Sequence, residues 1–355
     1  MSEFTTLMNT LDTALSLKRE HGGETEAKFV AWLCKQVCPT MIDGAGNIHV
    51  VLGTSRTMFT AHTDSVHHKE GANGIRKTAT HWYGDGDALG ADDGCGIALM
   101  LHMIAAGIPG RYMFFRGEEC GGLGSSWLAA EMPGLWSNYD RAIAFDRAGL
   151  GDVITHQAGG RCCSDIFANA LADALNADGL MYIPDATGVY TDTAEFISLI
   201  PECTNLSVGY DHQHGPKEEL NIAHFLALAE MVVKVNWEAL PTSRDPKVKE
   251  PRYKAPSDLG VWGGRSVFNK FAPLDESPEY WAAHSAITAA RTGLPRALVA
   301  LITEAVYPED PGLVKSYIKP AHFTDDMLAE ALNDLDFDPA ENVLLALYDL
   351  LPILA

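Results

Sequence analysis

Positively charged residues are scarce in this sequence, which holds 26 Lys and Arg against 47 Asp and Glu and carries a formal net charge of −21. Proteins that bind nucleic acid or anionic membranes present a basic surface. The composition therefore argues against both kinds of partner. The excess carboxylates either keep the surface soluble or gather in part to hold cations, and charge alone does not separate these two explanations.

Long apolar runs are also missing. None approaches the roughly 20 residues that a membrane-spanning helix needs. The first 21 residues have neither the basic start nor the small-residue cleavage site of a secretory signal, so we expect a cytoplasmic protein. The apolar residues of this segment instead mark one face of a helix, namely Phe4, Leu7, Met8, Leu11 and Leu15.

Cysteine is sparse and unevenly placed. The chain has 7 cysteines, of which Cys162 and Cys163 are adjacent, and it contains no C-x-x-C pair. An odd number and this spacing fit neither a disulfide framework nor a cysteine-rich zinc site. We therefore expect reduced thiols, most of them packed in the interior.

Strand and helix patterns alternate along the first two thirds of the chain. Strand patterns lie at 47–53, 57–64, 112–119, 141–149, 151–157 and 202–210. Helical patterns lie at 24–38, 95–106, 125–132, 163–179 and 221–240. Alternation with short connections predicts a three-layer α/β/α domain, in which helices cover both faces of a mostly parallel central sheet.

The composition changes at residues 241–260, which contain four prolines and few apolar residues. This segment is typical of a linker or an extended wrap. Beyond it the pattern is helical only. The sequence thus predicts a main domain at 1–240, a Pro-rich linker at 241–260 and a small all-α domain at 261–355. The helices of that last domain either cover a site or join subunits; we favour a homo-oligomer contact, because nothing in it resembles a substrate-binding group.

Carboxylates and histidines gather where the predicted strands end. In parallel α/β sheets, ligand sites form beyond the carboxyl ends of the strands. Five segments bring such side chains to this edge: His62 and Asp64, Asp92 and Asp93, Glu118 and Glu119, Asp146, and His214. Any one of them alone is more often an ordinary loop residue, but five glycine-flanked segments together indicate a site. Imidazoles and carboxylates without a thiolate suit zinc, cobalt or manganese.

The motifs HTD, GADDGCG, GEECGGLGS, FDRAG and HGPKE, in this order, resemble the co-catalytic di-zinc exopeptidases. That superfamily includes the zinc aminopeptidases, peptidase T and related amidohydrolases. The resemblance covers residues 1–240 and is carried by five motifs in register. It implies a metal-dependent exopeptidase that acts on short peptides with two divalent metal ions, zinc or else cobalt or manganese.

The resemblance also implies a ligand set. Asp92 would bridge the two metal ions. His62 and Asp146 would complete the shell of the first ion, and Glu119 and His214 that of the second. His212 could face the same way as His214, but the Gly-Pro-x-Glu run that follows position 214 matches the run after the family's ligand.

Three further features follow from the resemblance. Asp64 would accept the free ring N–H of His62 and fix its tautomer. Glu118 would act as general base and acid, taking a proton from a water that bridges the metals and passing it to the leaving amine. The peptide bond Asp92–Asp93 would be cis, as it often is in this superfamily.

The segment 183–200 resembles the loop that borders the substrate pocket in aminopeptidase members. Tyr190, Asp192 and Thr193 are therefore candidate substrate contacts, although a helix N-cap in this segment explains its Thr and Asp residues equally well. Arg161, which follows two glycines, could meet a substrate carboxylate. A surface salt bridge is the commoner fate of such an arginine.

Two departures separate this sequence from relatives with a lid domain. Only 67 residues lie between Asp146 and His214, which is too few for an inserted domain. Gly94 stands where relatives similar to peptidase T or the carboxypeptidases often have Lys. Both departures favour an aminopeptidase layout. Two alternatives stay open: an amidohydrolase that removes the acyl group from N-acyl amino acids at the same site, and a non-catalytic binding or assembly protein.

Overall fold

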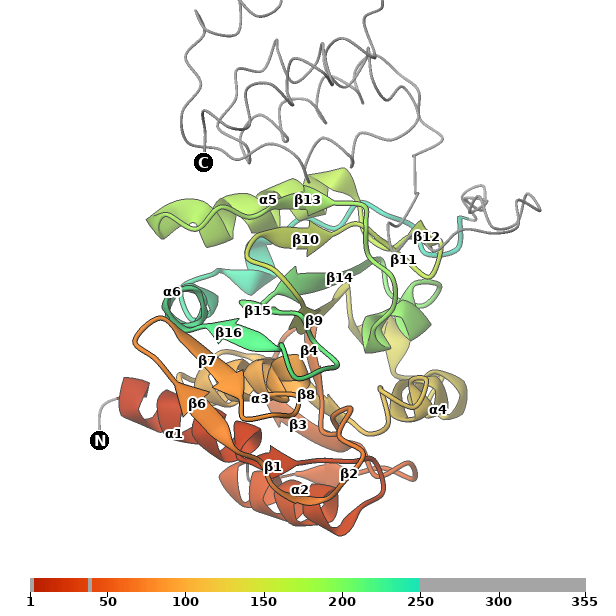
Figure 1. Cartoon of the computed structure of the whole chain (residues 1–355). Coiled ribbons are helices and arrows are strands. Elements are labelled where there is room, and N and C mark those ends of the chain that lie inside the picture. The colour runs from red at the N-terminus through yellow and green to blue at the C-terminus, as the bar shows by residue number, and fades with distance from the viewer. Residues whose placement is uncertain (1–2, 38–39, 249–355) are drawn as a thin grey trace, which may run out of the picture. The chain divides into compact units, whose positions relative to one another are not determined.

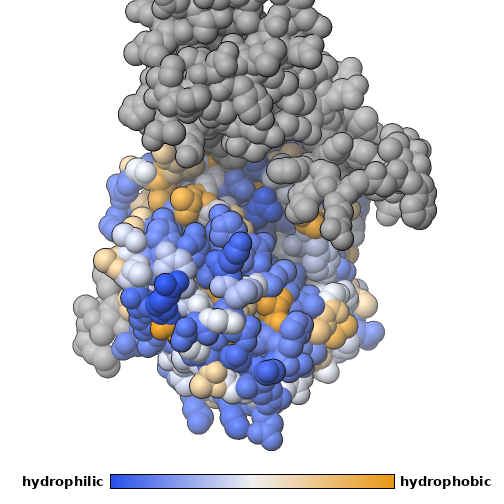
Figure 2. Space-filling view, in the orientation of Figure 1, coloured by the Kyte–Doolittle hydropathy of each residue, from blue (hydrophilic) through white to orange (hydrophobic). Residues whose placement is uncertain are grey.

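The computed structural model describes residues 3–37 and 40–248 (Figure 1). The predicted helical domain at 261–355 and most of the predicted linker lie outside the described residues. None of the helices in the described part is long and apolar enough to cross a membrane. The face in Figure 2 is mostly hydrophilic with scattered hydrophobic residues.

An eight-stranded sheet forms the centre of the domain, in the order β13-β10-β14-β9-β4-β8-β3-β2. Its strands in chain order are β2 Met41–Ile42, β3 Ile48–Leu52, β4 Thr57–His62, β8 Gly110–Phe115, β9 Arg141–Arg147, β10 Asp152–Ile154, β13 Ile183–Asp185 and β14 Glu202–Ser207. The four strands β14, β9, β4 and β8 run parallel to one another. Strands β10, β3 and β2 join by antiparallel pairing. The sheet is therefore mixed but mostly parallel, which confirms the predicted α/β fold.

Helices lie on both faces of this sheet. They are α1 Glu3–Leu15, α2 Glu24–Gln36, α3 Ala91–Ala105, α4 Leu123–Glu131, α5 Asp165–Leu175 and α6 Ile222–Val232, with 3-10 helices at Trp136–Asn138, Asn176–Asp178, Asp192–Phe196 and Trp237–Ala239. Successive strand residues point to opposite faces. On β8, Tyr112 and Phe114 belong to the core under α1, α3 and α6, whereas Met113 and Phe115 belong to a second core with Leu128 of α4.

Several short strands were not predicted. A four-stranded antiparallel sheet contains β6 Ile75–Lys77, β7 His81–Gly84, β15 Tyr210–Asp211 and β16 Glu219–Asn221. Two-stranded sheets pair β1 Leu17–Lys18 with β5 Gly71–Ala72, and β11 His156–Gln157 with β12 Gly160–Arg161. Strands of two to four residues are too short to show a period-two pattern. The connection between β15 and β16 carries His214, so this small sheet positions a predicted ligand.

Two predicted element ends differ from the structure. The helix predicted at 221–240 ends at Val232, where the indole N–H of Trp237 donates 2.9 Å to the Val232 carbonyl oxygen. The first residues of the predicted linker are hydrogen-bonded to the domain. The buried carboxylate of Glu202 accepts the backbone N–H of Ser243 at 2.7 Å and that of Arg244 at 3.0 Å.

His224 on α6 should make the fold sensitive to acid. Its Nε2 lies 3.0 Å from the Tyr182 hydroxyl, and burial lowers the pKa of His224 to about 4. An unfolded chain binds the proton near pH 6.5, so stability is intact above that pH. It falls by about 2 kcal/mol between pH 7 and pH 5, and further as the pH drops toward 4. We expect His224→Gln to flatten this fall in urea unfolding at pH 7 and pH 5. The control His68→Gln, at an exposed loop position, should not change it. An undiminished fall in His224→Gln would assign the acid sensitivity to other groups.

Candidate metal centre

Neighbouring parallel strands deliver the predicted ligands to one edge of the sheet. His62 is the last residue of β4, and Asp146 is the last but one of β9. Glu119 lies in the turn that follows β8. Asp92 stands at the start of α3, and His214 comes from the connection between β15 and β16.

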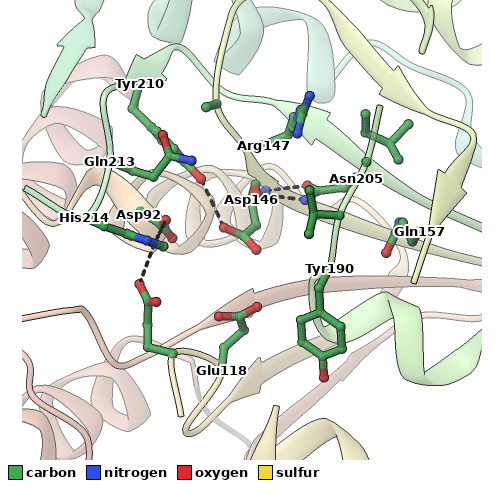
Figure 3. A pocket seen from close by; sticks show the side chains of 15 residues that line it. Asp92, Glu118, Asp146, Arg147, Gln157, Tyr190, Asn205, Tyr210, Gln213 and His214 are labelled. Carbon is green, nitrogen blue, oxygen red and sulfur yellow. Dashed lines mark hydrogen bonds and ion pairs between the residues drawn. The ribbon is translucent and has the colours of Figure 1, made fainter. Parts of the chain in front are cut away.

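Asp92 lies between the two histidines. Its Oδ1 is 3.0 Å from Nε2 of His62. Its Oδ2 is 3.0 Å from Nε2 of His214, which lies beside it in Figure 3. Each imidazole has a second carboxylate beside it. Nε2 of His62 is 3.6 Å from Oδ1 of Asp146, and Nε2 of His214 is 3.3 Å from Oε1 of Glu119. The structure therefore brings all five predicted ligands together, in two groups that share Asp92.

This donor set fits divalent cations. Oε1 of Glu119 is buried and makes no hydrogen bond, although His214 lies close to it. Burial and the nearby Asp92 raise the pKa of Asp146 to about 6. The hydrogen bond to Asp92, followed by the neighbouring Glu119 carboxylate, raises the pKa of His214 to about 10. Without cations the site must bind protons to offset its crowded carboxylates, and bound divalent ions would take over that role.

Buried carboxylates hold the backbone around these ligands. Oδ2 of Asp93 accepts the backbone N–H of His62 at 3.1 Å. Glu218 accepts the N–H groups of Gly90 and Asp92 at 3.0 Å and 3.1 Å. The peptide bond Asp92–Asp93 is cis, as the resemblance implied. The sequence interpretation gave no role to Glu218, although it stands four residues after His214 in the HGPKE motif.

Asp64 has contacts other than the predicted one. Nδ1 of His62 lies 3.2 Å from the backbone carbonyl oxygen of Asp64 and 3.5 Å from its carboxylate. The carboxylate also accepts the backbone N–H groups of Gly117, Glu118 and Glu119, at 3.0 to 3.3 Å, and its role toward the His62 tautomer stays a prediction. These bonds explain why the strand predicted at 112–119 ends at Phe115: the next N–H groups turn toward Asp64 and leave the sheet.

One carboxylate from α2 connects two site segments, an arrangement that we call the Glu26 bridge (Glu26, Thr63 and Arg116). Glu26 is fully buried. Its Oε1 accepts the Thr63 hydroxyl at 2.9 Å, and its Oε2 accepts Nη2 of Arg116 at 2.9 Å. Thr63 follows the ligand His62, and Arg116 starts the turn that carries Glu118. The Glu26 bridge therefore fixes these two segments relative to each other.

Polar neighbours orient the Asp146 carboxylate. The Thr191 hydroxyl donates to its Oδ2 at 2.6 Å, and the Tyr210 hydroxyl donates to its Oδ1 at 3.1 Å. Asn205 brackets the backbone of Asp146 with two hydrogen bonds of 2.8 Å. The sequence interpretation did not include Tyr210 or Asn205. Both stand in the buried segment at 202–210. Polar side chains within this otherwise apolar strand were the feature of the sequence that could have identified them.

A cavity of about 380 Å³ opens beside these groups. Its lining includes Glu118, whose carboxylate makes no hydrogen bond with the described residues and points into the pocket (Figure 3). Burial raises the pKa of Glu118 to about 9. Tyr190 also lines the cavity, as expected for a substrate contact.

The other predicted substrate contacts do not line this cavity. Asp192 and Thr193 are buried in the 3-10 helix behind it, and Thr193 donates its hydroxyl to the Thr204 carbonyl oxygen at 3.3 Å. Arg161 forms an ion pair of 2.7 Å with Asp165. Of the four predicted substrate contacts, Tyr190 lines the cavity and the other three do not, and the contact of each with substrate stays a prediction.

No protein-family model and no curated protein matches this sequence. Solved structures do match. An aminopeptidase PepT from Bacillus cereus aligns at 15% identity with a TM-score of 0.54, over 66% of this chain and 97% of that chain. A tripeptidase from Staphylococcus aureus aligns at 16% identity with a TM-score of 0.52, over 66% and 97%. The TET1 peptidase of Pyrococcus horikoshii aligns at 15% identity with a TM-score of 0.51, over 64% and 98%. The chain thus has the fold of these peptidases, the co-catalytic zinc exopeptidase fold.

Proposed function

We propose that this protein is a metal-dependent exopeptidase that removes the N-terminal residue from short peptides. The observation that supports it best is the arrangement around Asp92. Its two carboxylate oxygens face the Nε2 atoms of His62 and His214, each 3.0 Å away. This arrangement borders a cavity that also holds the unbonded carboxylate of Glu118.

Two divalent ions, zinc or else cobalt or manganese, would be held by His62, Asp146, Glu119 and His214, with Asp92 shared between them. Such ions lower the pKa of water and stabilise the negative charge that develops when an amide is attacked. A donor set of three carboxylates and two imidazoles suits all three metals.

Glu118 is the proposed proton carrier. Its carboxylate lines the cavity and is free of hydrogen bonds to the described residues, so it can take a proton from the attacking water and deliver it to the leaving nitrogen. Burial raises its pKa to about 9, while nearby cations favour the charged form and lower the pKa. A Glu118 pKa that cations lower from about 9 toward neutral pH lets this one group serve first as base and then as acid.

The pocket also supports the preference for short peptides. A volume of about 380 Å³ accommodates a few residues and no folded chain. The matched TET1 peptidase assembles into a tetrahedron or an octahedral shell, which supports the proposal that this chain forms a homo-oligomer as well. The C-terminal helices remain the proposed contact, and the cytoplasmic location stays a prediction.

A substrate panel tests this function. Metal-loaded protein should release the first residue from tripeptides with a free amino end, and N-acetylated versions of the same peptides should resist, because the amine is blocked. Faster hydrolysis of N-acyl amino acids would replace the proposal with an amidohydrolase. Bound metal without hydrolysis of any amide would support a non-catalytic binding protein.

A further inference from the structure

We infer that Arg147 makes this pocket selective for peptides that carry a carboxylate group, and this inference rests on the proposed exopeptidase function. Arg147 is the last residue of β9 and follows Asp146 directly. Among the described residues that line the cavity of about 380 Å³, it is the only Lys or Arg. Substrate in that cavity would therefore meet one fixed positive side chain.

The Arg147 guanidinium is held in a defined orientation. Its Nε donates to Oδ2 of Asp152 at 3.3 Å, and its Nη2 donates to the hydroxyl of Thr187 at 3.0 Å. Thr187 is itself fixed, because its backbone N–H donates to Oδ1 of Asp185 at 2.7 Å. A guanidinium that is already oriented loses less conformational freedom when it binds a ligand.

Part of the guanidinium is left for a ligand. Arg147 has five N–H groups, and its Nη1 makes no hydrogen bond with the described residues. The Arg147 side chain is 26% exposed, so it is accessible from the cavity while its hydrogen bonds to Asp152 and Thr187 hold it in place. The ion pair of Arg147 with Asp152 joins one nitrogen to one oxygen at 3.3 Å and is partly solvated, so it contributes little to the stability of the fold. The ion pair with Asp152 alone therefore does not explain why a charged residue stands at position 147.

The rest of the pocket explains why a carboxylate is the expected partner. In Figure 3, Asp92, Glu118 and Asp146 form an acidic side of the pocket, and the Arg147 guanidinium points away from them. The acidic side suits the metals and the amine of a peptide and repels an anion. A planar guanidinium binds a carboxylate through paired hydrogen bonds. A peptide with a carboxylate at some distance from its amine would match both ends of the pocket.

This assignment differs from the one that the sequence suggested. Arg161 was a candidate partner of a substrate carboxylate, with a surface salt bridge as the commoner fate. It forms such a salt bridge with Asp165 and does not line the cavity. Arg147 takes its place. The carboxylate can come from two sources: an acidic side chain on the N-terminal residue, or the free C-terminus of a dipeptide.

Matched peptide pairs separate these sources. The first pair is Glu-Ala-amide and Gln-Ala-amide, and the second is Ala-Ala and Ala-Ala-amide. We expect wild-type protein to prefer the carboxylate member of one pair by about 10- to 100-fold in kcat/KM, the effect of one charge-assisted hydrogen bond pair. In Arg147→Gln that ratio should fall to about 2 or less. A ratio between two substrates of one protein sample is insensitive to partial unfolding or metal loss.

Two further variants complete the test. Arg147→Lys keeps the charge but not the paired geometry, so it should retain part of the preference, whereas Arg147→Glu should favour Lys-Ala-amide over Glu-Ala-amide. The control Arg76→Gln changes an exposed arginine that stacks on Tyr83 and should keep the wild-type ratio. The inference is overturned if wild type shows no preference in either pair, or if the preference survives in Arg147→Gln. If no peptide of either pair is hydrolysed, the proposed function itself fails.

Discussion

Asp92→Asn protein is expected to lose both metal ions, whereas the wild type should bind about two divalent ions per chain. The two oxygens of Asp92 face different imidazoles, His62 and His214, at 3.0 Å each. Asparagine keeps one oxygen and replaces the other with an NH₂ group, which donates hydrogen bonds and cannot bind a cation. The change also removes a negative charge that both ions would share. Peptide hydrolysis should fall by at least about 10³-fold, because the reaction depends on the ions.

Metal analysis after equilibrium dialysis measures this effect directly. The fold should survive, because the backbone N–H of Asp92 still donates to Glu218 at 3.1 Å. The matched control Asp12→Asn removes a half-exposed carboxylate that pairs with Lys77 on the surface. It should keep two ions and full activity. Two ions retained in Asp92→Asn would show that the ligand set is assigned wrongly.

Glu118→Gln should have the opposite combination of effects: both metal ions stay bound, and hydrolysis falls by about 10²- to 10⁴-fold. Glutamine has the same shape, and the Glu118 carboxylate has no hydrogen bond in the described structure that the change would break. Its amide cannot take a proton from water or deliver one to the leaving nitrogen. Binding of the metals depends on Glu119 and His214, which lie 3.3 Å apart and are unchanged.

The two measurements on Glu118→Gln are metal content and the rate of peptide hydrolysis. Glu131→Gln, the same change at an exposed helix end, serves as the control and should behave as wild type in both. Wild-type rates in Glu118→Gln with metal bound would show that Glu118 is not the proton carrier. Loss of one ion would instead make Glu118 a ligand.

The sequence predicted the parts of the site that depend on strand ends. His62, Asp146 and Glu119 follow buried strands that are easily recognised, and parallel neighbours carry their ends to one edge. The groups around them are different. Glu26 lies in an amphipathic helix with nothing local to mark it, and its partners are 37 and 90 residues away in the chain. Contacts of this kind depend on tertiary packing, which local periodicity does not encode.

Asp64 shows the same limit in a residue that the sequence did single out. Its motif suggested a partner for the His62 ring, two residues away. In the structure its carboxylate lies 3.5 Å from Nδ1 of His62 and, in addition, accepts the backbone N–H groups of residues 117–119, more than 50 positions further on. A turn of this kind becomes visible only when β4 and β8 lie side by side. His214 was also predicted by motif, but the small sheet that carries it was not.

The Glu26 bridge has a consequence for how this sequence can change during evolution. Arg116 with an apolar residue at position 26 would leave a half-buried cation without its counter-charge, and a carboxylate at 26 without Arg116 would leave a fully buried anion. The second half-step costs about 3–5 kcal/mol, a large share of the stability of a typical domain. Positions 26 and 116 are therefore expected to change together among homologues, and position 63 should alternate between Thr and Ser while both charges are kept. Covariation of these three distant positions would show that homologues conserve the contacts by which one helix holds two segments of the candidate site.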